Sequence, residues 1–311
     1  MLKTIVSVIL AMTAVFTNLQ GFFSKPKTYL TDGVFLKYGA AANQCMDIFM
    51  PENPGDTVDV VLTIHGGSWM YGDQLQFDEY AKQAAKYGYV GVSMDHRKLN
   101  NNVRAQGMNE DILNAVAAVK RYLNDNGLSA GKMVVAGHSS GAHLALLYSY
   151  THYKDSPIPI AFVTAASAPG DLVLFAQGSM TASNNYFLMT ALSDENITAA
   201  TVGSGQARAL LAKINPIDLV TPEVPPTILL HGDMDEIVPY ECADRLYKTL
   251  RSNGVDAQLL TYKGQVHSLN LAPEKMKQAR LELMLSWAEK YLVADAPVPE
   301  TTGAASAPAD G

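Results

Sequence analysis

Short apolar runs alternate with segments of helical periodicity along most of this chain, and this alternation limits the folds that it can adopt. The runs are largely apolar or β-branched along their length, which is typical of strands that are covered on both faces. Strands that alternate with helices favour a mostly parallel central sheet flanked by helices, the α/β class. The predicted strands are residues 58–64, 89–94, 133–136, 160–166, 227–230 and 257–262.

Two segments carry the clearest helical periodicity. In the first, apolar residues recur at steps of three and four, which places them on one stripe of a helix, and Gly127 follows as the residue that ends it. The second lies near the C-terminal end of the chain. Residues 34–49, before the first core strand, are expected to add antiparallel strands at one edge of the sheet. The two stripes consist of Ile112, Ala115, Val116, Val119, Tyr122 and Leu123, and of Met284, Trp287, Ala288 and Tyr291.

Composition favours a single folded domain and excludes several classes of function. The chain has 311 residues, 48% of them hydrophobic, which is enough for one large core. Its formal net charge of -7 offers no basic surface to nucleic-acid phosphates. Two cysteines are too few for a cysteine-rich zinc site or a disulfide scaffold, and whether Cys45 and Cys242 pair with each other stays open.

The two ends of the chain differ in composition from the region between them. Lys3 precedes an apolar run over residues 5–16, which is shorter than a membrane span and typical of a secretory signal. We therefore expect residues 1–24 to be a signal peptide and the protein to be exported, with no membrane span left in the mature chain. A buried or interfacial N-terminal helix is the alternative. Residues 294–311 are rich in Ala and Pro and predict a disordered tail, which leaves one domain at residues 25–293.

The sequence GHSSG at residues 137–141 follows a predicted strand and precedes an apolar segment. In this strand–turn–helix context the G-x-S-x-G pattern predicts a tight turn that exposes the hydroxyl of its central residue. Ser139 is therefore a candidate nucleophile. The backbone N–H of Ser140, at the start of the helix, is suited to stabilise developing negative charge. The alternative is a Gly/Ser turn with no catalytic role.

A second motif, HGGSW at residues 65–69, follows the predicted strand at residues 58–64. Its glycines let backbone N–H groups approach a carbonyl oxygen without an intervening Cβ atom. Such donors, together with the N–H of Ser140, would stabilise an oxyanion. His65 is predicted to tie the loop down, and Trp69 is predicted either to line an acyl pocket or to pack beneath the loop. An ordinary strand-to-loop turn is the alternative.

Together these motifs resemble the α/β-hydrolase superfamily. Within it they are similar to the hormone-sensitive-lipase-like carboxylesterases, the bacterial feruloyl-esterase-like proteins, the kynurenine formamidases and the plant prenylcysteine methylesterases. The similarity extends over about residues 38–291 and includes MDIFMP at residues 46–51 and DHR at residues 95–97. His96 stands where the family usually has Tyr.

The resemblance also assigns donors within the HGGSW loop. It implies that the N–H groups of Gly67 and Ser68 belong to the oxyanion hole and that Gly66 shapes the turn. Ser68 occupies a position where the hormone-sensitive lipase group has Gly, so the loop departs from that group at one of its donors.

The same resemblance implies the chain order Ser, then Asp or Glu, then His, each on a loop after a strand. HGDMDEIVP at residues 231–239 matches H-G-x-x-D-x-x-V-P with Asp235 at the acid position. Asp233 is the competitor and is better suited to capping the turn. His267, on the loop after the last predicted strand, is the expected base for the proton of Ser139. Two further histidines are predicted to pack or to line the pocket: His138 and His143.

The implied function is hydrolysis of a small-molecule carboxylic ester through an acyl-enzyme. No metal or nucleotide motif follows any predicted strand, so no cofactor is expected. An amidase or peptidase of the formamidase or prolyl-oligopeptidase type, and a catalytically silent binding protein, are the other functions considered. The segment at residues 170–214 predicts a lid or pocket wall, with a plain pair of surface helices as the alternative. Its apolar residues, expected to contact an acyl or alcohol group, are Leu172, Leu174, Phe175, Met180, Tyr186, Phe187, Leu188 and Met189.

Overall fold

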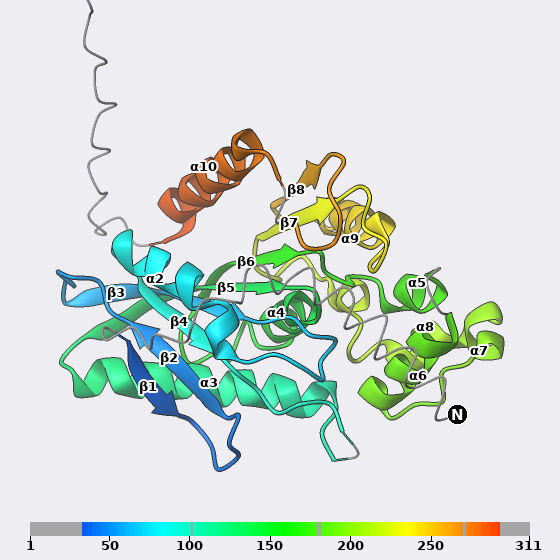
Figure 1. Ribbon diagram of the computed structural model, residues 1–311, viewed down its shortest axis with the longest axis horizontal. Coiled ribbons are helices and arrows are strands. Elements are labelled where there is room, and N and C mark those ends of the chain that lie inside the picture. Colours follow the sequence, from blue (N-terminus) through cyan, green and yellow to red (C-terminus); the bar gives the residue numbers. More distant parts are fainter. Residues whose placement is uncertain (1–32, 101, 179–181, 270–271, 293–311) are drawn as a thin grey trace, which may run out of the picture.

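An eight-stranded sheet forms the centre of the molecule, in the strand order β1-β2-β4-β3-β5-β6-β7-β8 (Figure 1). Strands β3 to β8 pair in parallel, whereas β1 and β2 add an antiparallel edge. The predicted mostly parallel sheet with an antiparallel edge is therefore confirmed. The strands are β1 Val34–Lys37, β2 Cys45–Phe49, β3 Thr57–Ile64, β4 Val90–Met94, β5 Ser129–His138, β6 Ile160–Ala166, β7 Thr227–Gly232 and β8 Ala257–Tyr262.

The computed structural model describes most of the chain between its two ends. The predicted signal peptide, residues 1–24, and the predicted tail, residues 294–311, both lie outside the described residues. The described residues are 33–100, 102–178, 182–269 and 272–292.

Helices cover both faces of the sheet, α2 and α10 on one face and α3, α4 and α9 on the other (Figure 1). Side chains of β5 show why the strands are apolar throughout, because Val134 packs toward α10 while Met133 and Val135 pack toward the opposite face. The predicted helical stripes lie in α3 and α10. The helices are α2 Asp78–Lys86, α3 Ala105–Asp125, α4 Ser140–Thr151, α9 Tyr240–Ser252 and α10 Glu274–Tyr291, with short 3-10 turns at Gln74–Gln76 and Pro216–Leu219.

The segment between β6 and β7 forms four short helices rather than a plain pair. They lie at the end of the sheet toward which the arrowheads of β5 and β6 point (Figure 1). Four of the eight apolar side chains expected to contact substrate are instead buried in the core: Leu172, Phe175, Leu188 and Met189. Leu174 and Tyr186 are half-buried and Phe187 is 69% exposed, while Met180 lies outside the described residues. The helices are α5 Leu172–Gln177, α6 Ala182–Ser193, α7 Ala199–Gly203 and α8 Gln206–Leu211.

Polar contacts tie the start of this insertion to helix α9. The buried carboxylate of Asp171 accepts the backbone N–H groups of Val173 and Leu174 and so caps α5. Its other oxygen lies 3.4 Å from Arg245 on α9 and 3.7 Å from Arg208 on α8. The start of the insertion is therefore fixed to a helix of the main domain, which distinguishes it from a freely hinged lid.

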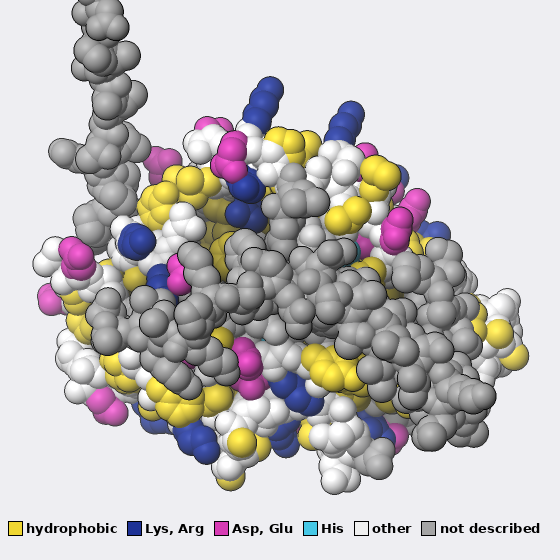
Figure 2. Space-filling model, in the orientation of Figure 1, with side chains coloured by type: hydrophobic (Ala, Val, Ile, Leu, Met, Phe, Trp, Pro, Cys, Tyr) yellow, Lys and Arg dark blue, Asp and Glu magenta, His cyan; other side chains and the backbone are white. Residues whose placement is uncertain are grey.

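The two cysteines are both buried and do not form a disulfide. The thiol of Cys45 lies 3.7 Å from the side-chain oxygen of Gln74, and that of Cys242 lies 3.6 Å from the carbonyl oxygen of Asp171. Within the described residues, no helix combines the length and apolar character that crossing a bilayer requires. On the described part of the face in Figure 2, acidic and basic side chains are interspersed.

Candidate active site

Ser139 occupies the turn between β5 and α4 in a backbone conformation that non-glycine residues rarely adopt, with φ 55° and ψ -124°. A Cβ atom at Gly137 would collide with the backbone of Gly141, and one at Gly141 would collide with the carbonyl of His65. Glycine at both positions therefore permits the tight turn and the close approach of α4 to β3. The N–H of Ser139 donates to the carbonyl of Ala166 on β6 at 2.8 Å, which fixes the turn to the neighbouring strand.

The hydroxyl of Ser139 lies next to an imidazole that is in turn bonded to a carboxylate. The distance from Ser139 Oγ to His267 Nε2 is 2.9 Å, and that from His267 Nδ1 to Asp235 Oδ2 is 2.8 Å. Because the carboxylate can only accept, Nδ1 carries the proton and Nε2 accepts the hydroxyl proton. The structure thus brings together the three predicted side chains from the loops after β5, β7 and β8, in the tautomer that a general base needs.

Donors surround the buried carboxylate of Asp235. Its Oδ1 accepts the N–H groups of Ile237 and Val238, each at 2.9 Å. Its Oδ2 faces His267 and also lies 3.2 Å from Nε2 of His231. Burial by itself raises the pKa of the Asp235 carboxyl, but hydrogen bonds from His231 and His267 outweigh it and hold that pKa below its ordinary value. The group is therefore ionised at neutral pH.

Asp233, the competing carboxylate, bonds elsewhere. It is exposed, and its Oδ1 accepts the N–H of Gly264 at 2.6 Å. The N–H of Met234 donates to the carbonyl of Gln265 at 3.1 Å, so the two loops are joined side by side. The structure therefore brings Asp235 to the imidazole of His267 and uses Asp233 to hold the turn before it.

The HGGSW loop contains three consecutive residues with positive φ. The values are 126° at Gly67, 53° at Ser68 and 62° at Trp69, and the last two are unusual for residues with a side chain. A Cβ atom at Gly67 would collide with the backbone of Tyr71, whose N–H donates back to the Gly67 carbonyl at 2.9 Å. The loop is thus a strained, tightly closed turn.

Several backbone N–H groups of the HGGSW loop and of the elbow have no acceptor in the part of the chain that the structure describes. Among the described residues, nothing accepts a hydrogen bond from the N–H groups of Gly67, Ser68 or Ser140. The loop and the elbow are in contact, because a Cβ atom at Gly66 would lie 3.3 Å from Cβ of Ser139. The structure therefore places Gly66, at the start of the loop, against Ser139, with Ser140 next to it in the chain.

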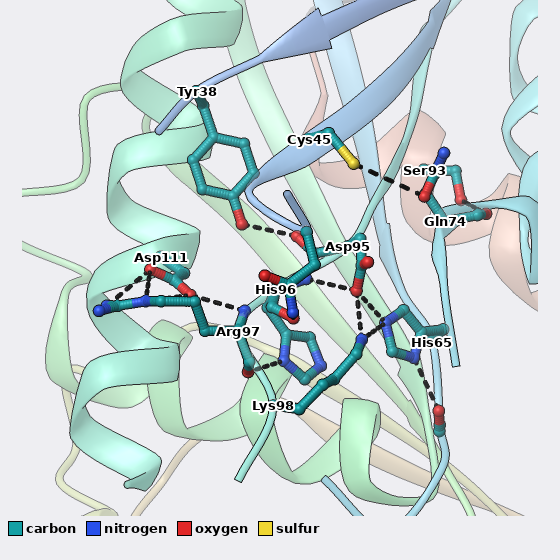
Figure 3. A network of polar contacts seen from close by, with 12 residues as sticks. Tyr38, Cys45, His65, Gln74, Ser93, Asp95, His96, Arg97, Lys98 and Asp111 are labelled. Carbon is teal, nitrogen blue, oxygen red and sulfur yellow. Dashed lines mark hydrogen bonds and ion pairs between the residues drawn. The ribbon is translucent and has the colours of Figure 1, made fainter. Parts of the chain in front are cut away.

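A buried polar network supports the HGGSW loop from behind (Figure 3). Nδ1 of His65 lies 2.7 Å from the carbonyl oxygen of Gly66, and Nε2 lies 2.9 Å from Oδ1 of Asp95. The ammonium group of Lys98 contacts the same carboxylate oxygen. Burial opposes ionisation of Asp95, yet hydrogen bonds from His65 and Lys98 hold the pKa of its carboxyl below the ordinary value. The ion pair of Asp95 and Lys98 thus orients His65. This agrees with the predicted role of His65, which is to hold the loop in place.

A second layer of contacts holds this network (Figure 3). The His96 ring stacks on His65, with ring centroids 4.7 Å apart and planes 8° apart. Its Nδ1 donates to the carbonyl of Arg97 at 2.8 Å, and burial lowers the pKa of the His96 imidazole well below its ordinary value. Arg97 pairs with the buried carboxylate of Asp111, and the hydroxyl of Tyr38 donates to the carbonyl of Asp95 at 2.6 Å.

Trp69 packs beneath the loop. It is only 2% exposed, and its indole N–H donates to Nδ1 of His143 at 3.2 Å. Nε2 of His143 donates in turn to the carbonyl of Ile214 at 2.8 Å, at the end of the insertion. Burial lowers the pKa of the His143 imidazole to about 4, so this connecting ring is neutral. These contacts favour the packing role for Trp69 over direct contact with substrate.

Three supporting residues were not assigned a role from the sequence. Asp95 directly follows a predicted strand, and His231 opens the matched acid motif, so their positions carried a signal. No motif in the sequence marks Lys98, because it reaches the HGGSW loop only when β3 and β4 lie side by side in the sheet. Within the described residues, no cluster of three or more His, Cys, Asp or Glu side chains is arranged to hold a metal ion.

Comparison with known proteins gives one family and several relatives. The model of the BD-FAE family matches residues 46–250. The chain is 22% identical over 250 residues to the probable isoprenylcysteine alpha-carbonyl methylesterase ICMEL1 of Arabidopsis thaliana, covering 74% of this chain and 50% of that protein. It is 24% identical over 219 residues to the esterase LipC of Mycobacterium tuberculosis, covering 69% and 54%. The chain thus spans about half the length of these relatives.

Solved structures share the fold. Esterase B of Lactobacillus rhamnosis superimposes with a TM-score of 0.71 at 19% sequence identity, covering 90% of this chain and 94% of that one. At this level of identity the similarity establishes the arrangement of sheet and helices, the α/β-hydrolase fold, and leaves the chemistry to the side chains.

Proposed function

Because the chain belongs to the BD-FAE family, we propose that it is a serine hydrolase that cleaves a carboxylic ester through an acyl-enzyme on Ser139. The observation that carries this proposal is the continuous hydrogen-bonded series from Ser139 to His267 to Asp235, with distances of 2.9 and 2.8 Å. A nucleophile, a base in reach of its proton and an acid that orients the base are the parts that this chemistry requires.

In the first half of the reaction, Ser139 Oγ attacks the ester carbonyl carbon while its proton passes to Nε2 of His267. The carbonyl oxygen then carries the negative charge of the tetrahedral intermediate. When the bond to the alcohol oxygen breaks, the alcohol leaves with the proton from His267, and the acyl group stays on Ser139. Asp235 stabilises the imidazolium that exists between these two proton transfers.

In the second half, a water molecule gives a proton to Nε2 of His267 and attacks the acyl carbon. Collapse of the second tetrahedral intermediate breaks the bond to Ser139 Oγ, which takes the proton back as the carboxylic acid leaves. In both halves the oxyanion would be bound by the N–H groups of Gly67, Ser68 and Ser140. Each such donor contributes about 3 kcal/mol to stabilisation of the transition state in hydrolases of this kind.

The apolar rim of the site supports a substrate with an apolar part. Met234 and Val266, each next in sequence to a member of the proposed triad, are 59% and 43% exposed. Large apolar side chains in solvent beside a nucleophile are suited to contact an acyl chain or an alcohol group. We therefore expect medium-chain acyl esters to be cleaved in preference to acetate.

The test is turnover of p-nitrophenyl acetate, butyrate and octanoate by the purified chain, beside Ser139→Ala. We expect Ser139→Ala to lower kcat by at least about 10⁴-fold. Ser149→Ala, which removes a buried hydroxyl from α4, is the matched control and should keep turnover. A folded wild-type protein with no turnover and no labelling by a fluorophosphonate would favour the silent binding protein. Faster cleavage of a p-nitroanilide than of the matching ester would favour the amidase.

We also propose that the protein is exported, on the basis of the apolar run at residues 5–16 after Lys3. Expression of the full chain in a bacterial host, followed by mass measurement of the periplasmic protein, tests this. Cleavage near residue 24 is the expected result, and an uncleaved cytoplasmic chain would contradict it.

A further inference from the structure

The carbonyl oxygen of His267 accepts two hydrogen bonds from residues outside its own loop. Nε2 of His138 lies 3.0 Å from it, and Oγ of Ser167 lies 2.8 Å from it. A carbonyl can only accept, so both partners donate. His138 ends β5, directly before the elbow, and Ser167 follows the last residue of β6. The main chain of His267, the proposed base, is thus attached to the ends of β5 and β6, the strands next to Ser139.

Ser167 is held in an unusual conformation for this contact. It is fully buried with φ 50°, and its N–H donates to the carbonyl of Leu230 on β7 at 2.8 Å. Ser139, at the end of the neighbouring strand, has a similar φ of 55°. Strained non-glycine residues persist where the surrounding structure over-determines them, and they concentrate at functional sites. Here both strained serines point at the same histidine, one at its ring and one at its main chain.

His138 connects the base to the rest of the site. Its ring centroid lies 5.0 Å from that of His267, and a Cβ atom at Gly66 would lie 3.3 Å from its Nδ1. Burial and the nearby His267 lower the pKa of the His138 imidazole to about 4. The ring is therefore neutral near pH 7, and its single proton is on Nε2, where the carbonyl of His267 requires it.

We propose that His138 and Ser167 are positioning residues that clamp the main chain of His267 and keep its ring within reach of Ser139. This inference rests on the proposed function, because it concerns the geometry of the same base. The loop needs such a clamp, since Lys263, Gly264 and Val266, which precede His267, are exposed. A misplacement of about 1 Å can lower catalysis by roughly 10²-fold.

Three substitutions at His138 separate the hydrogen bond from the shape of the ring. Gln can place its amide nitrogen near the position of Nε2, Asn reaches only as far as Nδ1, and Phe keeps the ring without a donor. We expect His138→Phe and His138→Asn to lower kcat for p-nitrophenyl butyrate by roughly 10- to 100-fold at nearly constant KM. His138→Gln should recover most of the loss. His152→Phe, at the far end of α4, is the matched control.

Ser167→Ala tests the second donor without changing the ring. We expect a smaller fall in kcat, about 3- to 10-fold, because His138 still holds the carbonyl. The double variant Ser167→Ala with His138→Phe should lose more than either single variant. Ser167→Ala also keeps the proposal testable if His138→Phe does not fold, which circular dichroism would show.

A readout independent of turnover is the downfield proton resonance of His267 Nδ1–H in its bond to Asp235, identified by its loss in His267→Gln. The clamp predicts a resonance that broadens and exchanges faster in His138→Phe and is restored in His138→Gln. Wild-type kcat with an unchanged resonance in His138→Phe would overturn the clamp and leave the proposed function intact. A resonance that responds as expected in a protein that cleaves no ester would overturn the proposed function and leave the clamp intact.

Discussion

The HGGSW loop on one side of Ser139, and the loops that carry Asp235 and His267 on the other, are held in place by different kinds of interaction. The HGGSW loop rests on a buried ionic group, in which Asp95 and Lys98 pair beneath His65. The acid and base loops contain a single buried carboxylate, Asp235, which is surrounded by backbone N–H groups and imidazoles. Breaking a buried ion pair leaves an uncompensated charge, whereas losing one of several neutral donors leaves the others in place. Removing the charge of Asp95 should therefore mainly lower the free energy of unfolding, whereas removing the charge of Asp235 should mainly lower kcat.

This difference matches what each side is proposed to do. The oxyanion loop acts through backbone N–H groups that must stay fixed, and a strained turn needs strong support from outside to remain closed. The base must instead accept and release a proton in every turnover. A carboxylate held by several donors can stabilise the imidazolium without becoming protonated itself.

Asp235→Asn gives the largest expected effect, and its main effect should be on catalysis. The amide keeps the shape of the side chain but presents a donor to His267 and favours the wrong imidazole tautomer. We expect kcat for p-nitrophenyl butyrate to fall by about 10³- to 10⁴-fold. The melting temperature should also fall, because the ionised Asp235 carboxylate stabilises the folded protein. Steady-state kinetics and thermal unfolding of the same preparation measure both. A fall of less than tenfold would show that Asp235 does not orient the base.

Asp95→Ala should reverse this pattern, with a large loss of stability. Removing the carboxylate leaves the half-buried Lys98 beside the buried His65 without its counter-ion. We expect a loss of about 2–4 kcal/mol, somewhat less than for a fully buried pair. Urea unfolding at pH 7 measures the free energy. Asp194→Asn is the control. It removes the charge of an exposed ion pair with Arg104, which should contribute no more than about 1 kcal/mol, and Asn tolerates the positive φ of 66° at this position. Equal losses in the two variants would contradict a buried ionic support.

Acid should weaken the protein in two steps that involve different groups. The pKa of His143 is lowered from 6.5 in the unfolded chain to about 4 in the folded protein. The unfolded chain therefore takes up the proton first, and stability present above pH 6.5 is lost as the pH falls toward 4. The carboxyls of Asp95 and Asp235, whose pKa values are also lowered, lose their contribution only below about pH 4.

His143→Gln isolates one group in the first step. We expect it to reduce the slope of unfolding free energy against pH, between pH 6 and 4.5, by about 1.4 kcal/mol per pH unit. Urea unfolding at several pH values measures this slope. His152→Gln, which removes a histidine outside the core, is the control. An unchanged slope in His143→Gln would mean that the ring is not held neutral between Trp69 and Ile214.

The sequence could predict the parts of the site that lie directly after strands. The carboxyl ends of parallel strands meet at one edge of the sheet, so a motif after each strand is sufficient to bring Ser139, Asp235 and His267 to the same edge. The parallel core was predictable for a related reason, because strands buried on both faces have a distinctive composition.

The contacts that the sequence could not predict depend on which elements are neighbours in space. Lys98 reaches His65 only because β4 pairs with β3, and no local pattern encodes that pairing. The bond from His138 to the main chain of His267 depends on the path of a loop 129 residues away. The sequence could not tell which apolar residues of the insertion pack in the core, as Leu172 and Met189 do, because such side chains have the same composition as those that line a pocket.

Asp233→Asn gives the smallest expected effect, and it compares two carboxylates of the same loop. Asp233 and Asp235 lie on the same loop and carry the same charge, but only Asp235 is bonded to the imidazole of His267. If hydrogen bonding to the ring is what matters, neutralising the exposed Asp233 should change kcat by less than about 3-fold and stability by less than about 1 kcal/mol. Kinetics at low and high salt measure the effect. A fall approaching that of Asp235→Asn, and one that salt reduces, would show instead that the net negative charge of the loop supports the base.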